Sequence, residues 1–307
     1  MPKNNHPPVV LFLYRRPGNA LQLLNLIADS GTKRVYVYAD GPRDLQDKSA
    51  TDQVRRIVLD YAKSHSTINF ITHFSSKNKG LKSSIVSGLN SVFAKEDSAI
   101  ILEDDCIPHP DFFPFVRKML DKYENESRVM SVTGTTVTSG NMNSYDFCKY
   151  AQCWGWATWK RSWDIYDPEI KSFQQGDNVW IQKTWKNPVA RWYWKAALKI
   201  VKGGEIDTWD YQWSYAHLRS GGLVATPSVN LVQNIGFDQL ATHTKLKSSV
   251  ANMEAESLDF PLIHPPSVHE NKHLSQALER KFYTTLPALL GMLFYVLRSS
   301  LRRIYAR

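Results

Sequence analysis

Three consecutive carboxylates, Glu103, Asp104 and Asp105, directly follow an apolar run that is typical of a buried strand. Like charges this close repel one another, so the arrangement calls for a positive partner. Adjacent strand residues point to opposite faces, but the chain turns where a strand ends, and one or two of the acids can then meet a cation. Mg²⁺ and Mn²⁺ prefer oxygen ligands such as carboxylates and substrate phosphates. The triplet predicts a divalent-cation site; the alternative is an acidic loop or the start of a helix at 112–122.

The elements that would position this triplet alternate along the first 135 residues. Strand-like runs occupy 9–14, 34–40, 68–74, 99–105 and 128–134. Between them, apolar residues recur at helical spacing within 54–61 and 85–93. This rhythm predicts an α/β fold with a mostly parallel sheet flanked by helices. Ligands of such sheets bind outside the carboxyl ends of the strands, where both Asp40 and the triplet stand.

The remainder of the chain differs in composition and in secondary-structure pattern. All ten tryptophans fall between Trp154 and Trp213, and the alternation of strands and helices is lost. We therefore expect one continuous domain, made of a β/α half at 1–140 and a less regular, aromatic-rich half at 141–265. A basic amphipathic tail, 266–307, would follow it.

Composition narrows the class of protein. The chain has 307 residues, of which 43% are hydrophobic and 22% charged, as in ordinary globular proteins. Three cysteines without zinc spacing predict neither a disulfide framework nor a zinc site, and favour a reducing compartment. The apolar run near the N-terminus is too short for a signal peptide or a membrane span. These features predict a cytoplasmic protein.

The net charge of +9 is concentrated near the C-terminus, where residues 271–307 hold seven Lys or Arg and one Glu. An apolar run there is joined to Arg298, Arg302, Arg303 and Arg307. One interpretation is an interfacial helix that places its arginines at anionic headgroups on the inner face of the membrane. The other is a helix packed on the core with a solvated basic end. No nucleic acid partner is expected, because the basic residues lack interleaved aromatics and glycines.

Three segments carry a resemblance to a known family. "ILEDDCIPHPDFFPF" (101–115) resembles the metal-binding segment of GT-A glycosyltransferases, in particular the N-acetylglucosaminyltransferase I type. "KNKGLKSSIVSGLN" (77–90) is similar to a loop and helix beside the nucleotide in family 2 glycosyltransferases. "CWGWATWKRSWDIYD" (153–167) resembles a segment that lines their donor and acceptor pockets. The resemblance extends over residues 8–245 and implies a GT-A fold. It also implies that 1–140 is the nucleotide-sugar-binding half and 141–265 the acceptor and catalytic half.

The resemblance also implies roles for the acids and tryptophans. Asp105 would hold Mn²⁺ or Mg²⁺ against a nucleotide diphosphate, Asp104 would face the ribose or the sugar, and Glu103 would contact donor sugar hydroxyls. His243 would be a late ligand of the metal or diphosphate, although a lone histidine is more often structural. Trp154 and Trp156 would line the donor pocket, with core packing as the alternative.

Further donor contacts are expected at the ends of other strands. Asp40 would accept a hydrogen bond from a uracil N–H by the same resemblance; the alternative is an Asx turn in which Gly41 supplies a positive φ. Arg15 or Arg16 would reach the diphosphate, because guanidinium groups suit phosphate oxygens. Asn78 and Gly80 precede a helix whose N-terminus attracts phosphate, or they form a simple turn.

The resemblance places a catalytic base in a Trp-Asp segment, which matches Asp210. Asp207 is the second candidate, with a helix cap as its structural alternative. Aromatic neighbours would partly desolvate Asp210 and make it a better base. The predicted function is inverting, metal-dependent transfer from a UDP-sugar to a glycan or lipid-linked acceptor, in surface polysaccharide synthesis. The alternatives are a nucleotidyltransferase of the same fold and a non-catalytic carbohydrate-binding protein.

Overall fold

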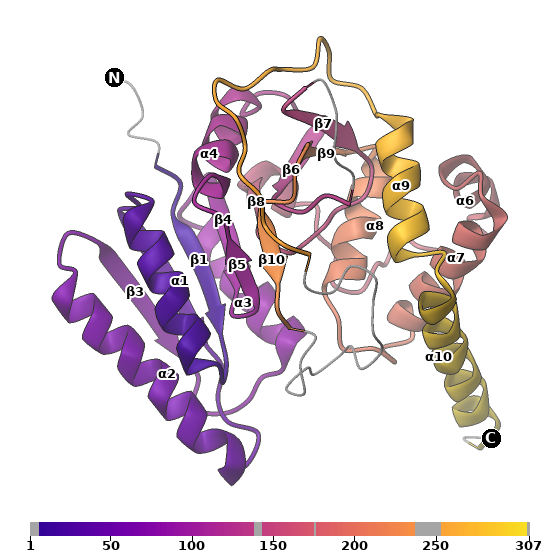
Figure 1. Cartoon of the computed structure of the whole chain (residues 1–307). Helices are drawn as coiled ribbons and strands as arrows, with labels where there is room; N and C mark the ends of the chain where they lie inside the picture. The colour runs from indigo at the N-terminus through magenta and orange to yellow at the C-terminus, as the bar shows by residue number, and fades with distance from the viewer. Residues whose placement is uncertain (1–5, 138–142, 175, 237–252, 306–307) are drawn as a thin grey trace.

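The computed structural model describes residues 6–137, 143–174, 176–236 and 253–305. An eight-stranded sheet with helices on both faces forms its centre (Figure 1). The strands are β1 Val9–Leu13, β2 Arg34–Ala39, β3 Asn69–Phe74, β4 Ser98–Glu103, β5 Cys106–Pro108, β6 Val129–Thr133, β7 Tyr145–Cys148, β8 Trp156–Trp159, β9 Leu223–Pro227 and β10 Val232–Asn234. The helices are α1 Pro17–Asp29, α2 Leu45–Ser64, α3 Leu81–Phe93, α4 Phe112–Lys122, α5 Lys160–Trp163, α6 Asn178–Thr184, α7 Pro188–Lys202, α8 Asp210–Ser220, α9 Lys272–Phe282 and α10 Leu286–Tyr305.

The strand order of the large sheet is β3-β2-β1-β4-β8-β6-β9-β7. Strands β1 to β4 are parallel to one another, β8 is antiparallel to both β4 and β6, and β9 is parallel to β6. Strands β7 and β8 therefore run against the other six strands of this sheet. The prediction of a mostly parallel α/β sheet is confirmed. Strands from both 1–140 and 141–265 contribute to it.

Two hydrophobic cores lie on the two faces of this sheet. In β1, Val9, Leu11 and Leu13 pack into one core, whereas Val10 and Phe12 pack into the other. This alternation follows from the two-residue period of a strand, and it explains why every residue of β1 is apolar. Helices α1, α2 and α4 cover the first face, and α3, α7 and α8 cover the second.

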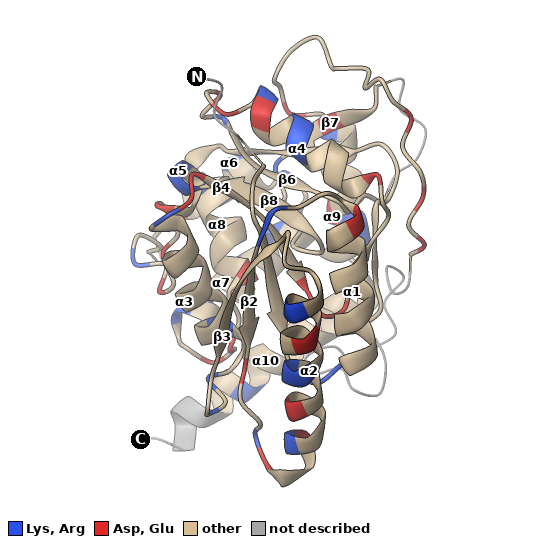
Figure 2. Cartoon of the chain, turned by 90° about the vertical axis from the view of Figure 1, so that its left-hand side faces the viewer, with Lys and Arg blue, Asp and Glu red and all other residues tan. Residues whose placement is uncertain are grey.

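The helices predicted between the first strands are present. The apolar stripe within 54–61 lies on α2, whose outer side carries interspersed acids and bases, as a solvated helix face does (Figure 2). The stripe within 85–93 is the buried side of α3. The helix predicted at 112–122 is α4. After β9 the chain leaves the large sheet, and β10 pairs with β5 in a separate two-stranded sheet directly after the acid triplet.

Most tryptophans of the second half belong to the core. Trp156 packs against Trp209 with ring centroids 5.4 Å apart, and Trp163 against Trp213 at 5.3 Å. Seven of the ten are buried: Trp156, Trp159, Trp163, Trp185, Trp194, Trp209 and Trp213. Core packing, the alternative interpretation of the cluster, therefore holds for these seven.

The tail forms two helices that pack onto the second core. Leu274 and Leu278 anchor α9, and Met292 anchors α10, which lies along α7. Within the described part of the chain, no single helix is long and apolar enough to cross a membrane. Helix α9 and residues 286–301 of α10 reach that length and hydropathy together, but they are bent by 63°.

His217 on α8 makes the stability of the fold depend on pH. Its Nδ1–H donates to the Trp213 carbonyl (3.0 Å), and its Nε2 accepts from the Ser131 hydroxyl (2.8 Å), so the neutral ring is satisfied. Burial lowers the pKa of His217 from 6.5 to about 4. The unfolded chain therefore takes up this proton first, and stability that is complete above about pH 6.5 is lost as the pH falls toward 4.

We expect the wild type to lose about 2 kcal/mol of unfolding free energy through this group between pH 7.5 and 5.0. The substitution His217→Gln should remove that part of the pH dependence, whatever its effect at pH 7.5. Urea unfolding of both proteins at the two pH values measures it. An equal pH dependence in the two proteins would contradict the assignment.

Candidate active site

The acid triplet stands at the carboxyl end of β4 and is held by the loop that follows β1. The Tyr14 backbone N–H donates to Asp104 Oδ2 (2.9 Å), and Arg16 Nη1 donates to Asp104 Oδ1 (2.6 Å). Asn19 Nδ2 donates to the Asp104 carbonyl (2.8 Å). Asp104 is buried, and its two carboxylate oxygens are engaged by the protein. It is placed to position the loop, which differs from the expected contact with a ribose or sugar.

Arg16 is the positive group that the sequence required beside the triplet. Its Nη1 lies 2.6 Å from Asp104 Oδ1 and 3.9 Å from Asp105 Oδ2. Burial raises the pKa of Asp104, and the Arg16 guanidinium opposes that rise. Since Arg16 adjoins the partly exposed Asp105 carboxylate, it lies where it can also approach an anion bound there.

Glu103 connects the triplet with the second half of the chain. Burial raises the pKa of Glu103 well above its ordinary value, and the neighbouring charges of Asp105, Asp104 and Asp210 raise it further. The Arg16 guanidinium has the opposite effect. Glu103 and Asp210 are far apart in the sequence, yet they lie within electrostatic reach of each other in the fold.

Asp105 is the more accessible of the two aspartates, with 26% of its side chain exposed against 10% for Asp104. Its carbonyl accepts from the Ile235 N–H (2.9 Å), so the segment after β10 lies directly against it. A Cβ at Gly236 would come within 2.2 Å of Asp105 Oδ2, which explains a glycine there. The expected metal ligand His243 lies outside the described residues.

The acids at this strand end fit one kind of metal site. In the part of the chain that the structure describes, no three His, Cys, Asp or Glu side chains are grouped to hold a metal ion. A cation held by one or two carboxylates and completed by substrate phosphates needs no such group. The partly exposed Asp105 carboxylate, next to Glu103, matches that requirement.

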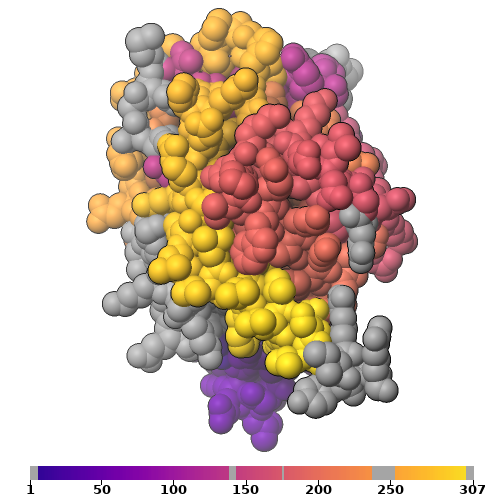
Figure 3. Space-filling model, turned by 90° about the vertical axis from the view of Figure 1, so that its right-hand side faces the viewer, coloured from indigo at the N-terminus to yellow at the C-terminus, as the bar shows by residue number. Residues whose placement is uncertain are grey.

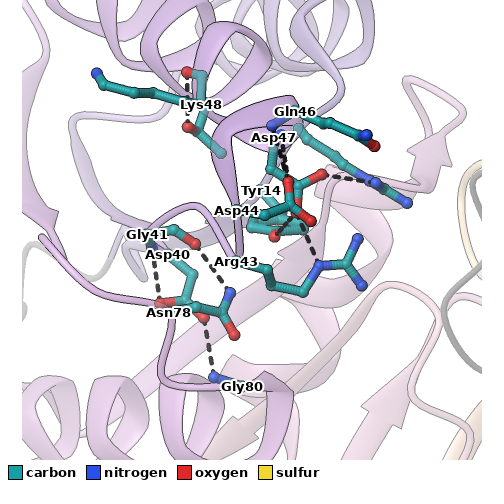
Figure 4. Close-up of polar contacts among 12 residues, drawn as sticks. Tyr14, Asp40, Gly41, Arg43, Asp44, Gln46, Asp47, Lys48, Asn78 and Gly80 are labelled. Carbon is teal, nitrogen blue, oxygen red and sulfur yellow. Dashed lines mark hydrogen bonds and ion pairs between the residues drawn. The ribbon is translucent and has the colours of Figure 1, made fainter.

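Asp40 and the loop at 75–80 form a second cluster at the strand ends (Figure 4). The Asp40 carboxylate accepts from the N–H groups of Gly41 (2.8 Å), Lys79 (2.9 Å) and Gly80 (3.1 Å). Asn78 Nδ2 donates to the Gly41 carbonyl (2.9 Å). The partners of Asp40 at Lys79 and Gly80, and that of Asn78 at Gly41, lie in different loops, so these are contacts between loops and not the local turns given as alternatives. The uracil contact expected of Asp40 would compete with three amides.

The reason for glycine at 41 differs from the one expected. Its φ is not among the positive values in the described residues, so no left-handed conformation is involved. A Cβ there would lie 2.4 Å from the Lys77 carbonyl carbon, and the two loops could not approach. Close packing of the loops after β2 and β3, rather than a positive φ, therefore requires Gly41.

Gly80 caps the N-terminus of α3 with φ +80°, and Asp207 lies beside it. A Cβ at Gly80 would stand 3.0 Å from Asp207 Oδ2. Trp209, not Asp207, is the N-cap residue of α8, so the helix-cap alternative for Asp207 is not observed. Two carboxylates, Asp40 and Asp207, thus already lie where the positive end of the α3 dipole was expected to attract phosphate.

Asp210, the expected base, is the first residue of α8. Its Oδ1 accepts from the Thr208 hydroxyl and from the Tyr211 N–H (2.9 Å). Asp210 is exposed, so the expected desolvation by aromatic neighbours is wrong. Its charge adds to burial in raising the pKa of Tyr211, Tyr283 and Cys153. Asp210 therefore lies within electrostatic reach of both Glu103 and these side chains.

Arg15 is committed to an internal ion pair. Arg15 Nη1 lies 2.8 Å from Asp47 Oδ1, while the Tyr14 hydroxyl (2.5 Å) and Arg43 Nε (2.8 Å) donate to Asp47 Oδ2 (Figure 4). The Arg43 contact, with those from Tyr14 and Arg15, holds the pKa of Asp47 well below its usual range. Of the two arginines proposed for the diphosphate, only Arg16 adjoins the acid triplet.

The two tryptophans of the matching segment lie in different places. Trp154 is partly exposed, packs edge-on against Phe282 (5.6 Å between ring centroids), and its carbonyl accepts from the Thr135 hydroxyl. Trp156 lies in the aromatic core and is 1% exposed. Trp154 therefore remains a candidate for a sugar contact. Trp156 lies in the core, as the alternative interpretation expected.

Three residues that matter to this site escaped the sequence analysis: Asp47, Gly236 and Tyr283. Asp47 follows the helix-capping Asp44 by three positions, a place where acids usually serve the helix itself. Tyr283 is far along the chain in the tail. Only Gly236 carried a signal, since a glycine directly after a strand-like run marks a close backbone approach.

The similarity of the chain to known proteins is weak, and it carries no argument about function. No protein-family model matches the chain, and no curated protein matches it. A mannosyltransferase from Pyrobaculum calidifontis, solved with GDP-Man and Mn²⁺, has 11% identity and a TM-score of 0.39, covering 70% of each chain. A UDP-glucose pyrophosphorylase complexed with UDP-glucose has 8% identity and a TM-score of 0.32, covering 55% of this chain and 81% of its own. A mannose-1-phosphate geranyltransferase from Thermus thermophilus has 6% identity and a TM-score of 0.33, covering 72% of this chain and 73% of its own.

Replacing Asp47 with asparagine should destabilise the protein, because the buried position would keep three donors around a neutral amide. We expect a loss of about 2 kcal/mol in unfolding free energy, at the low end for charged networks since Arg15 and Arg43 are partly exposed. Urea unfolding measures it. Asp52→Asn, on the exposed side of the same helix beside Lys48, is the matched control and should change stability much less. Equal effects of the two substitutions would contradict the role of Asp47.

Proposed function

We propose that the protein is a metal-dependent glycosyltransferase of the GT-A type, which moves a sugar from a nucleotide diphosphate sugar to an acceptor hydroxyl. The observation that carries this proposal is that the acid triplet and Asp210, which are distant in sequence, lie within electrostatic reach of each other. The triplet Glu103–Asp105 ends β4, and Asp210 opens α8 across from Glu103. A donor diphosphate at the triplet would hold its sugar between the two.

On the donor side, Asp105 would hold the cation and Arg16 would approach the diphosphate. Glu103 would form a hydrogen bond with a donor sugar hydroxyl. Asp104 fixes Arg16 and the Tyr14 backbone in position. When bound, the divalent cation supplies charge neutralisation for the departing diphosphate.

On the acceptor side, Asp210 would take the proton of the attacking hydroxyl. The acceptor oxygen then forms a bond to the anomeric carbon as the bond from that carbon to the diphosphate oxygen breaks, and the electron pair leaves with the nucleotide diphosphate. Attack from the face opposite the leaving group gives the inverted anomer. Asp207, at the N-terminus of α3, is the second candidate for this proton transfer.

The acceptor proposed is a glycan or lipid-linked glycan, with UDP as the nucleotide. A uracil contact through Asp40 would compete with its three backbone amide partners, so we propose the base contact for the two loops that carry Asp40 and Asn78. Partly exposed Trp154 offers a flat face for a sugar ring.

The test is release of nucleotide diphosphate from a panel of nucleotide sugars, with Mn²⁺ and with a chelator. The wild type should hydrolyse one donor slowly with Mn²⁺ and not with chelator. Asp210→Asn should reduce turnover on the order of 10²–10⁴-fold and leave donor binding unchanged, because it removes a base. Asp105→Asn should lose Mn²⁺-dependent nucleotide binding.

Asp60→Asn, on the exposed side of α2, is the matched control and should behave as the wild type. If Asp207→Asn lost activity and Asp210→Asn kept it, Asp207 would be identified as the base. Pyrophosphate release from a nucleoside triphosphate and a sugar 1-phosphate would replace the proposal with a nucleotidyltransferase. Absence of any nucleotide binding would replace it with a carbohydrate-binding protein.

A further inference from the structure

Helix α10 exposes a stripe of large apolar side chains. Six residues are between 42% and 68% exposed: Leu286, Leu290, Leu293, Phe294, Leu297 and Leu301. At 3.6 residues per turn, their spacing places them within about 100° of the helix circumference. Scattered apolar residues are normal on a surface, but a continuous stripe of six marks an interaction face.

The other side of α10 is used to hold the helix on the protein. Met292 is buried in the second core, and the Ser299 hydroxyl donates to Glu205. Figure 3 shows α10 lying along the helices of residues 178–202, with its distal part at the edge of the molecule. The stripe is therefore presented by an anchored helix, in a fixed orientation relative to the sheet.

The charges that the tail itself places near the stripe are mostly positive. Glu279 is the only acid among residues 271–307, and it is buried and accepts from the Tyr150 hydroxyl (2.5 Å). Arg298 is exposed, and the helix sequence continues with Arg302 and Arg303. The surface around the stripe thus offers cations and no carboxylate from this segment.

We propose that the α10 stripe docks on an anionic lipid surface. An apolar stripe beside arginines matches a helix that lies in the headgroup region, where leucine and phenylalanine enter the acyl boundary and arginine meets phosphate. A second copy of the chain fits less well. Two such stripes facing each other would bring together the arginines of two tails, whose single acid, Glu279, is buried.

The docking helix is connected to the candidate active site. Phe282, the last residue of α9, packs on Trp154, and Tyr283 packs on Tyr193 (5.5 Å between centroids). The Tyr193 hydroxyl bonds to that of Tyr211, whose N–H donates to Asp210. In Figure 1, β1 and α10 both extend toward the lower edge, so the carboxyl ends of the strands and α10 share one side of the molecule. Docking would hold the candidate active site near the lipid surface, which, resting on the proposed function, favours a membrane-borne acceptor.

The test is co-sedimentation of the full chain with vesicles of phosphatidylcholine alone or with phosphatidylglycerol. The wild type should bind the anionic vesicles and bind less at high salt. The double substitution Leu293→Ser, Phe294→Ser should weaken binding by more than about tenfold, since two large apolar side chains no longer enter the lipid. Arg298→Gln should weaken it by about fivefold, the value of one cation near such a surface.

The matched control is Leu21→Ser, Leu59→Ser, which removes two equally exposed leucines from α1 and α2. It should bind vesicles as the wild type does. Equal binding by the stripe variant and this control would overturn the proposal, as would a wild type that binds no anionic vesicle. Self-association in sedimentation velocity that the stripe variant abolishes, without vesicle binding, would identify a second copy as the occupant.

Donor hydrolysis separates this proposal from the proposed function. The stripe variant should hydrolyse the nucleotide sugar in solution as the wild type does, and should transfer less sugar into the lipid-extractable fraction of membranes. Vesicle binding without any donor hydrolysis would leave docking intact and remove the transferase. Donor hydrolysis without vesicle binding would support the transferase and remove the docking proposal.

Discussion

The buried carboxylate of Asp104 is the constraint on which the site depends. Taking a carboxylate out of water is costly unless charged or amide donors replace the lost hydration. Here the Tyr14 N–H and the Arg16 guanidinium supply those donors. Because Tyr14 and Arg16 follow β1 and Asp104 follows β4, the same contacts tie together the carboxyl ends of two adjacent parallel strands. This arrangement fixes Glu103 and Asp105 at the carboxyl end of β4, where Glu103 lies within electrostatic reach of Asp210.

Close backbone approaches then assemble the loops around the tied strand ends. Gly41 lets the loop after β2 touch that after β3, and Gly236 lets the segment after β10 touch Asp105. Gly155, with φ +61°, leaves room for the Val232 methyl groups, and a Cβ there would lie 2.6 Å from one of them. The loops are therefore held by packing and hydrogen bonds before any ligand arrives, which reduces the entropy lost on binding.

The tail extends the same scaffold. Its two helices close the aromatic half of the second core, and Tyr283 at their junction packs on Tyr193 within electrostatic reach of Asp210. Helix α10 thus buries one side against the protein and leaves its other side apolar and accessible. A soluble helix that only covers a core would carry polar residues on that outer side.

The sequence by itself determined the α/β class, the strands β1 to β4 and β6, and the helices α2, α3 and α4. It predicted the carboxyl end of β4 as the place for chemistry. These features depend on local periodicity and on a run of acids at a strand end, which are visible along the chain. For Asp40 and Asp207 the sequence offered both a functional role and a structural alternative, and it did not decide between them.

Only the tertiary structure decided which side chains meet. It paired Arg16 with the triplet and Arg15 with Asp47, placed Trp156 in the core, left Asp210 exposed, and set Asp207 against Gly80. Each of these depends on contacts between residues distant in sequence, and side chains of the same type, such as Arg15 and Arg16, differ only in the direction in which the folded backbone points them. Direction and burial follow from the packing of the whole chain, so no local pattern encodes them.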